Sequence, residues 1–281
     1  MTDFKRNEPR YVPGDDGLLV ERVGNWVIDK HKILADYVQA AGAARRKFLR
    51  NSPAFIDVFS GPGRSQIRDT DRFVDGSSIV TFKQGNKSVA AFSSIEISDG
   101  DDDLLKACET RLERLDAPAN ATQGPATVAM KSIVAKLNPY GLHFAFLDPH
   151  NLGALSFSLF ESMAPLRHID VLVHVSLQDL RRNVDRYSSE AHEEFDVFAP
   201  GWRTEIDIDQ HTKPLRAAII KYWSSKVEAL GLPRAEHCEI IIGDQGQHLY
   251  WLMLLSKSDF AHKLWHEITS AYKQPKFSFV D

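Results

Sequence analysis

The feature that most constrains this chain is a repeated alternation of short apolar runs with amphipathic segments of helical spacing. The apolar runs are at 54–59, 89–97, 143–147 and 169–175. Segments with helical spacing lie around and between them, at 24–48, 78–84 with Ser77 as its cap, 103–115, 127–137 and 155–164. Strands joined by helices of this length form parallel sheets with helices on both faces. We therefore expect an α/β protein with a doubly wound, mostly parallel, Rossmann-like sheet.

The two ends of the chain and the stretch at 178–234 depart from this alternation. Residues 239–242 and 248–255 flank a glycine-containing turn and predict an antiparallel terminal hairpin, followed by a helix over 259–272. Between 178 and 234 the strand pattern disappears, which indicates a mostly helical insertion. Residues 1–17 combine prolines and glycines with charges and predict a flexible entry segment. We expect a single domain over 18–281.

Composition excludes several classes of protein. Only two cysteines, Cys108 and Cys238, occur in 281 residues, so we expect neither a disulfide framework nor a cysteine-based metal site. No apolar run approaches the roughly 18 residues that span a membrane, and no secretory signal is present, so we expect a cytoplasmic protein without a membrane partner. A net charge of -4 gives no global argument for nucleic acid, although a local basic groove remains compatible with it.

The first apolar run ends in a possible ligand-binding loop. In an open parallel sheet, ligands bind beyond the carboxyl ends of the strands, where the strand order reverses. The loop contains Asp57, Ser60, Gly61 and Gly63, and its glycines allow the backbone to approach a ligand closely. An ordinary strand-to-loop turn would explain the same glycines.

Two further strand ends carry candidate residues. Glu96 follows in the second run, where an acidic side chain of a nucleoside-binding fold accepts hydrogen bonds from ribose hydroxyls. Asp148, Pro149 and His150 follow the third run, and the proline fixes the chain so that Asp148 faces the same crevice. A solvated glutamate and a simple Asp-Pro turn are the structural alternatives.

Together these residues resemble a known series. The loop 55–63, residues 76–78, Glu96 and the segment 146–150 resemble the class I S-adenosylmethionine-dependent methyltransferases. With Trp26 and Lys30 in the preceding helix, they more narrowly resemble the three-Cys-motif partner protein (TcmP) family. The resemblance implies a seven-stranded sheet, S-adenosylmethionine as cofactor and a companion protein that carries three cysteines.

The resemblance leaves two functions open. One is an S-adenosylmethionine-binding methyltransferase-like protein that methylates nucleic acid, alone or with its companion. The alternative is a catalytically inert interaction module that docks the partner, which is favoured by departures from the family pattern at 124–126 and 150–151. A nicotinamide dehydrogenase ranks below both, because the glycine loop lacks its third glycine.

In the catalytic case, the implied mechanism holds a target amine by hydrogen bonds to the Asp148 carboxylate and the Pro149 carbonyl. His150 would then stack on the target or take the released proton. Several basic clusters could contact phosphate, unless they are simply solvated helix faces. These clusters are 30–32, 45–50, 181–186 and the arginines Arg64, Arg68 and Arg72. Whether the acceptor is DNA, RNA or protein stays open, and so does the oligomeric state.

Overall fold

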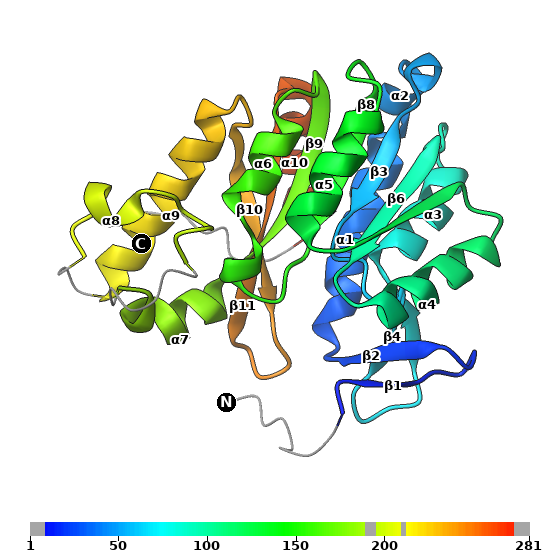
Figure 1. Ribbon diagram of the computed structural model, residues 1–281, viewed down its shortest axis with the longest axis horizontal. Coiled ribbons are helices and arrows are strands. Elements are labelled where there is room, and N and C mark those ends of the chain that lie inside the picture. The colour runs from blue at the N-terminus through cyan, green and yellow to red at the C-terminus, as the bar shows by residue number, and fades with distance from the viewer. Residues whose placement is uncertain (1–8, 189–194, 209–211, 273–281) are drawn as a thin grey trace.

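The computed structural model describes residues 9–188, 195–208 and 212–272, which form two sheets and their covering helices (Figure 1). The large sheet has seven strands in the order β10-β11-β9-β8-β3-β6-β7. In chain order the strands are β3 (Ala54–Asp57), β6 (Ser94–Asp99), β7 (Ala119–Gln123), β8 (Leu142–Leu147), β9 (His168–Ser176), β10 (Arg234–Ile242) and β11 (His248–Ser256).

The strand directions match the expected fold class. Strand β11 is antiparallel to both of its neighbours, β9 and β10, whereas the remaining pairs of the sheet are parallel. From β3 the chain runs outward through β6 to β7 and then returns to β8 on the other side of β3. The strand order therefore reverses between β3 and β8, the place where open α/β sheets bind ligands. The predicted α/β class, with a doubly wound, mostly parallel, Rossmann-like sheet of seven strands and an antiparallel terminal hairpin, is confirmed.

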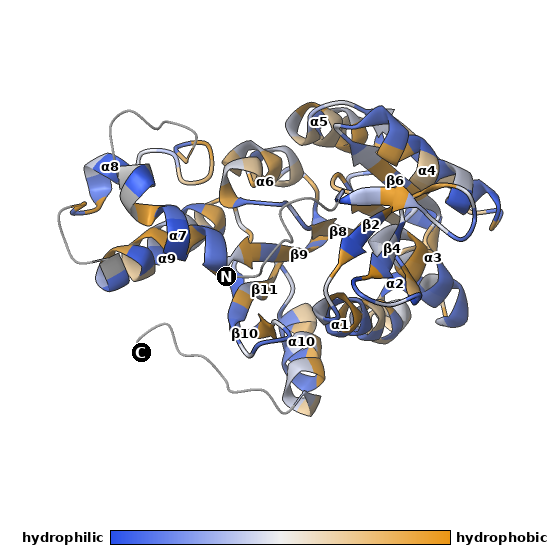
Figure 2. Ribbon diagram, turned by 90° about the horizontal axis from the view of Figure 1, so that it is seen from below, coloured by the Kyte–Doolittle hydropathy of each residue, from blue (hydrophilic) through white to orange (hydrophobic). Residues whose placement is uncertain are grey.

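Helices cover both faces of this sheet (Figure 2). One face carries α1 (Trp26–Ala40), α3 (Ser77–Lys87), α4 (Asp102–Glu113) and α10 (Asp259–Ala271). The other carries α5 (Ala126–Lys136), α6 (Phe157–Met163), α7 (Leu177–Ser188), α8 (Trp202–Glu205) and α9 (Thr212–Ala229). Because the central strands are covered on both sides, β3 is buried at every position, which explains its continuous apolar run. No described helix is both long and apolar enough to cross a lipid bilayer.

A second, four-stranded sheet was not expected from the sequence. Its order is β1-β2-β4-β5, with β1 (Tyr11–Pro13), β2 (Leu19–Val23), β4 (Arg64–Ile67) and β5 (Phe73–Asp75). Residues 1–8 of the predicted flexible segment lie outside the described residues, but the rest of that segment contains β1. The segment after the glycine loop, for which no strand was predicted, forms β4 and β5. Each of these strands has only three to five residues, too few to show a clear periodicity.

Several boundaries also differ from the predictions. The helix expected over 24–48 ends at Ala40 and is followed by the short α2 (Gly42–Arg46) and a 3-10 turn, η1 (Leu49–Asn51). Ser77 does not cap α3, because Gly76 holds the N-cap position. The second strand begins five residues later than expected and continues to Asp99. The described part of the predicted insertion is mostly helical, with α7, α8 and α9 joined by turns, and 189–194 and 209–211 lie outside the described residues.

Candidate functional site

A cavity of about 820 Å³ opens at the carboxyl ends of β3, β6 and β8. The glycine loop after β3 lines one side, and the small sheet contributes Glu21 and Val23. Its size lies within the range of small-molecule and cofactor sites, about 300 to 1,000 Å³. The cavity therefore occupies the position that the strand order predicts for a ligand.

The glycine loop exposes its backbone to this cavity. Gly61 and Gly63 have φ angles of 54° and 75°, which favour residues without a Cβ atom. A Cβ atom on Gly61 would meet nothing within 4 Å, so a side chain there would occupy open cavity. A Cβ atom on Gly63 would lie 2.9 Å from Cys108 Sγ, so this glycine is required for packing. Of the predicted cofactor-binding residues, Ser60, Gly61 and Gly63 line the cavity.

Asp57 lies beneath the loop and does not line the cavity. Its side chain is fully buried and accepts hydrogen bonds from the hydroxyls of Ser77, at 2.5 Å, and Ser78, at 2.9 Å. Burial raises the pKa of Asp57 to about 6, and the two serine hydrogen bonds oppose that rise. Asp57 therefore ties the glycine loop to the start of α3 and has no direct access to a ligand in the cavity.

Glu96, the predicted ribose-binding carboxylate, also lies outside the cavity. It is in the middle of β6, opposite Ile56, and its Oε1 accepts a hydrogen bond from Asn120 Nδ2 at 3.0 Å. The carboxylate at the strand end is instead Asp99, which lines the cavity. Asp99 Oδ2 accepts a hydrogen bond from the backbone N–H of Gly61 at 3.0 Å. The register of β6 therefore brings the Asp99 carboxylate to the cavity and leaves Glu96 outside its lining.

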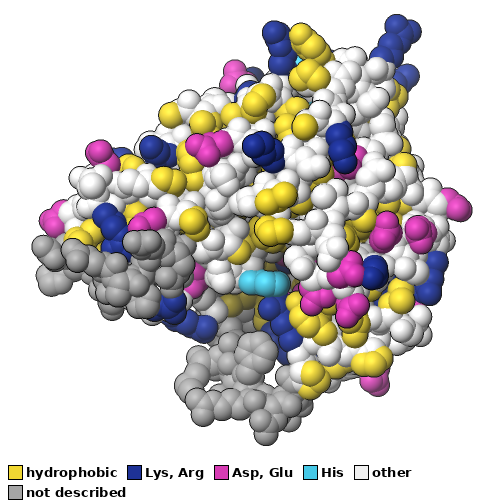
Figure 3. Space-filling view, in the orientation of Figure 1, with side chains coloured by type: hydrophobic (Ala, Val, Ile, Leu, Met, Phe, Trp, Pro, Cys, Tyr) yellow, Lys and Arg dark blue, Asp and Glu magenta, His cyan; other side chains and the backbone are white. Residues whose placement is uncertain are grey.

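Acidic side chains continue beyond Asp99. Asp101 caps α4 by accepting hydrogen bonds from the backbone N–H groups of Asp103 and Leu104. Figure 3 shows acidic side chains gathered over the region of α4, on the same face of the molecule as a histidine in its central hollow. Negative charge at this end of the sheet is favourable for a positively charged ligand.

Asp148 is the centre of a polar cluster on the opposite side of the cavity. Lys30, a buried residue of α1, donates a hydrogen bond to Asp148 Oδ2, and His174 Nδ1 lies 2.7 Å from Asp148 Oδ1. Burial alone would raise the pKa of Asp148, but the Lys30 ammonium and the His174 hydrogen bond lower it well below its ordinary value. Asp148 is therefore an ionised carboxylate with a donor on each oxygen. The predicted residues Asp148, Pro149, His150, Trp26 and Lys30 all line the cavity.

His150 contacts Arg10, which immediately precedes β1. Arg10 Nη2 lies 2.7 Å from His150 Nδ1 and 3.1 Å from Nε2, and the same guanidinium donates two hydrogen bonds to Glu21. Burial and the Arg10 charge lower the pKa of His150. A guanidinium beside the ring makes His150 a poor acceptor for a further proton.

Two residues that the sequence did not suggest complete the cluster. His174 and Tyr250 line the cavity, and their ring centroids lie 3.8 Å apart. His174 Nε2 and Tyr250 Oη are buried and have no hydrogen-bond partner among the described residues. Burial lowers the pKa of His174 and, with the charge of Asp148, raises that of Tyr250 well above its ordinary value. The sequence pattern that could have indicated these two residues is a polar side chain within an apolar strand. This indication is weak, because such residues are also common in protein cores.

Only part of the predicted basic clusters reaches the cavity. Lys30, His31 and Arg64 line it, and Arg64 donates two hydrogen bonds to Asp15. Lys32 lies 4.7 Å from the Tyr272 ring centroid. The cluster 45–50 precedes β3, at the amino end of the sheet, and its buried member Arg45 donates to the carbonyl of Ala90. Arg181 and Arg182 are exposed on α7. Of these clusters, Lys30, His31 and Arg64 are therefore the members that line the cavity among the described residues.

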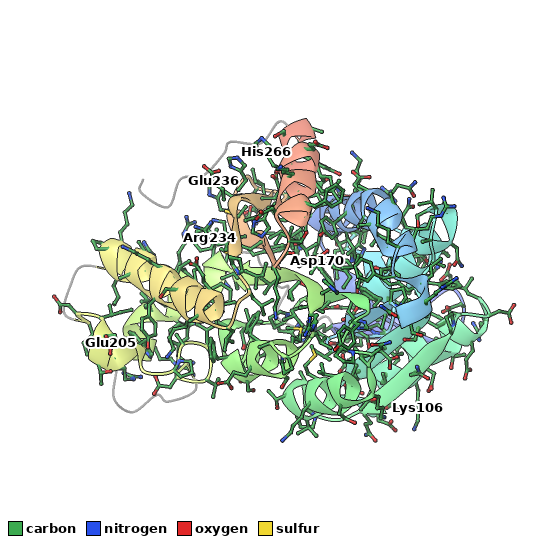
Figure 4. All side chains as sticks on the ribbon, turned by 90° about the horizontal axis from the view of Figure 1, so that it is seen from above. Lys106, Asp170, Glu205, Arg234, Glu236 and His266 are labelled. Atoms are coloured by element: carbon green, nitrogen blue, oxygen red, sulfur yellow. The ribbon has the colours of Figure 1, made fainter. Side chains whose placement is uncertain are left out.

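A second hollow, of about 410 Å³, lies between β10 and α10. It is lined by His237, His262 and His266, and the rings of His237 and His266 stack at 4.4 Å. Figure 4 shows Glu236 and His266 on these two neighbouring elements. Among the described residues, no group of three or more histidine, cysteine or acidic side chains is arranged to hold a metal ion.

Solved structures with a similar fold include two O-methyltransferases. One, from Bacillus cereus in complex with SAH, has 12% sequence identity and a TM-score of 0.48, over 82% of this chain and 81% of that chain. The other, TomG from Streptomyces achromogenes in complex with SAM, has 11% identity and a TM-score of 0.44, over 80% and 90% of the two chains. No protein-family model and no curated protein matches the sequence. The fold class rests on the strand order described above.

Proposed function

We propose that this protein binds S-adenosylmethionine in the cavity and transfers its methyl group to an acceptor beside Asp148. The observation that carries this proposal is the meeting of the glycine loop, Asp99 and Asp148 in one cavity, at the point where the strand order reverses. The residues fit such a donor. Gly61 leaves open space for a ligand against the backbone, and the cavity has room for a nucleoside and a small acceptor together.

The roles of the chain follow from this arrangement. The backbone at 60–63 would lie against the donor, and the Asp99 carboxylate would accept hydrogen bonds from its ribose hydroxyls. The bound donor supplies an electrophilic methyl group on a positively charged sulfur. The ionised carboxylates of Asp99 and Asp148 favour that charge, and Pro149 fixes the direction of the chain after Asp148. Methyl transfer requires alignment above all, which a rigid strand end provides.

The resemblance to the TcmP family supports two narrower proposals, a nucleic-acid acceptor and a companion protein with three cysteines. The second candidate function is an inert docking module. It is favoured by one observation, the engagement of both Asp148 oxygens by Lys30 and His174. In that case the cavity would hold the donor without transferring its methyl group.

Calorimetry with S-adenosylmethionine and with S-adenosylhomocysteine tests donor binding directly. We expect saturable binding at a dissociation constant well below ~1 mM. Absence of binding by folded protein at that concentration would exclude both the cofactor and the methyltransferase function. Donor binding together with an interaction surface on α7–α9, and no transfer to any nucleic acid, would favour the docking module.

A further inference from the structure

We propose that His174 and Tyr250 form the acceptor subsite, that the methylated group is a neutral hydroxyl, and that its proton passes to His174 Nε2. This inference rests on the proposed function, because it requires the donor in the adjacent part of the cavity. It assigns the proton to a residue other than His150.

Two polar atoms in the cavity wall lack hydrogen-bond partners among the described residues. His174 Nε2 and Tyr250 Oη are buried in the wall of the cavity without hydrogen-bond partners among the described residues. A buried polar group left unpaired costs about 1 to 3 kcal/mol. Two such groups on touching rings, 3.8 Å between centroids, indicate that a ligand supplies both hydrogen bonds.

One of these two atoms can accept a hydrogen bond and the other can donate one. The ionised Asp148 carboxylate can only accept, so His174 Nδ1 carries the hydrogen and Nε2 has a free lone pair. Tyr250 remains protonated because its pKa is raised, so Oη can donate. A hydroxyl is the group that does both tasks with one atom. It donates its hydrogen to His174 Nε2 and accepts the hydrogen of Tyr250.

Charge selects a hydroxyl over an alkyl amine. The buried ammonium of Lys30 lies on the other oxygen of Asp148, and the donor's sulfonium would be close by. An alkyl amine is protonated near neutral pH, so it would add a third positive charge and would have no lone pair for attack. A neutral hydroxyl has neither disadvantage.

The proposed methyl transfer forms one bond and breaks one bond at the methyl carbon. The hydroxyl oxygen forms a bond to the methyl carbon while the carbon–sulfur bond breaks, and that electron pair remains on sulfur. The hydroxyl proton passes to His174 Nε2, and the resulting imidazolium is paired with the Asp148 carboxylate. The products are a methyl ether and a neutral thioether. Tyr250 donates to the oxygen as its negative charge develops, which is the electrostatic part of the catalysis.

The test uses nitrogen NMR of His174 in the full chain, with S-adenosylhomocysteine or S-adenosylmethionine bound. We expect the Nδ1–H tautomer, and a lower pKa for His174 in the sulfonium complex than in the thioether complex. The groups that face His174 are Asp148 after β8, Lys30 on α1, Tyr250 on β11 and His150. Variants at Lys30 would separate the effect of the Lys30 charge on the His174 pKa from the effect of the donor's charge. Phenol and cyclohexanol serve as hydroxyl probes, and benzylammonium as the charged amine probe.

Phenol or cyclohexanol should shift the His174 resonances, whereas benzylammonium should not; which alcohol binds distinguishes an aromatic from an aliphatic acceptor. Tyr250→Phe should weaken binding of the hydroxyl probe about tenfold without changing the affinity for S-adenosylhomocysteine. Tyr222→Phe is the control, because the Tyr222 hydroxyl donates to the Pro200 carbonyl outside the cavity, and it should change neither affinity. With labelled donor, His174→Gln should reduce transfer to the probe by roughly 10²- to 10⁴-fold and remove the rise in rate through the His174 pKa.

An Nε2–H tautomer, or protein that binds S-adenosylhomocysteine but shows no response to either hydroxyl probe, would overturn this inference and leave the proposed function intact. Failure to bind S-adenosylhomocysteine at all would instead contradict the proposed function.

Discussion

Arg111 on α4 donates two hydrogen bonds to the carboxylate of Asp16, each at 2.7 Å. Its third nitrogen donates to the backbone carbonyls of Leu19, at 2.8 Å, and Pro62, at 2.5 Å. The side chain is only 6% exposed. One guanidinium thus joins the small sheet, a helix of the large sheet and the glycine loop of the cavity.

Removing this guanidinium should weaken both the fold and the loop. For Arg111→Met we expect a loss of about 2 to 4 kcal/mol in the free energy of unfolding, because the Asp16 carboxylate and two carbonyls lose their donor. Donor affinity should fall as well, since Pro62 lines the cavity. Urea denaturation and calorimetry measure the two effects. Arg114→Met is the matched control, because Arg114 is 52% exposed and 3.9 Å from Asp16; equal effects of the two variants would contradict this role.

The same pair predicts a loss of stability in acid. The hydrogen bonds from Arg111 lower the pKa of Asp16 from 3.8 to about 2. Because the folded-state pKa is depressed, this stabilisation is complete above about pH 4 and disappears as the pH falls towards 2. The expected contribution is about 2 kcal/mol. Unfolding measured against pH should show it as a difference between wild type and Asp16→Asn that vanishes near pH 2.

Asp57 predicts the opposite dependence on pH. Burial raises its pKa to about 6, so its ionisation destabilises the fold as the pH rises from about 4 to 6. Asp57→Asn cannot ionise. The free energy of unfolding of this variant, relative to wild type, should therefore increase by roughly 2 to 3 kcal/mol between pH 4 and pH 7. A constant difference over this range would show that Asp57 ionises as easily in the fold as in the unfolded chain.

The two glycines of the loop should respond differently to alanine. Gly63→Ala should destabilise the protein by about 2 kcal/mol or more, because its φ is positive and the Cβ atom would lie 2.9 Å from Cys108 Sγ. Gly61→Ala has only the backbone strain, about 1 kcal/mol, but its Cβ atom projects into open space in the cavity wall. Thermal unfolding should therefore detect Gly63→Ala more strongly, and donor calorimetry should detect Gly61→Ala.

A comparison of Asp99 with Glu96 tests which carboxylate contacts the donor. Asp99→Asn should weaken donor binding about tenfold, since it removes a charged acceptor from the cavity. Glu96→Gln should leave donor affinity within about twofold, because its side chain contacts Asn120 outside the cavity. Calorimetry on both variants measures this, and the reverse order of effects would restore the role that the sequence assigned to Glu96.

Sequence patterns located the strand ends that form the site, because each of these patterns is contained in a short stretch of residues. The buried run of β3, the glycines that follow it and the Asp-Pro pair after β8 are each contained within a few residues. The reversal of strand order then brings these segments together, and the parallel direction of the strands places their carboxyl ends at one edge. This is why Ser60, Gly61, Gly63 and Asp148 could be predicted to lie close together.

The predictions and the structure differ where strand register or long-range pairing decides the position of a residue. Glu96 and Asp99 are on the same strand, and only the point where β6 stops pairing shows which of them reaches the cavity. The strands of the small sheet are too short to be recognised alone, and β2 pairs with β4 across more than forty residues. His174 and Tyr250 are polar residues within the mostly apolar strands β9 and β11, and the sequence alone does not distinguish such residues from ordinary core residues.

The sequence by itself determined the α/β class, the glycine loop and the Asp148-Pro149 pair after β8. Hydrophobic periodicity and turn residues are properties of a few neighbouring residues, so they can be recognised without the tertiary structure. Only the tertiary structure decided the chemistry of the site. Lys30 reaches Asp148 from a helix 118 residues away, and His174 reaches it from the adjacent strand. Three features depend on burial and on charges distant in sequence, which no local pattern encodes. They are the ionisation of Asp148, the tautomer of His174 and the lack of a hydrogen-bond partner for Tyr250 Oη among the described residues.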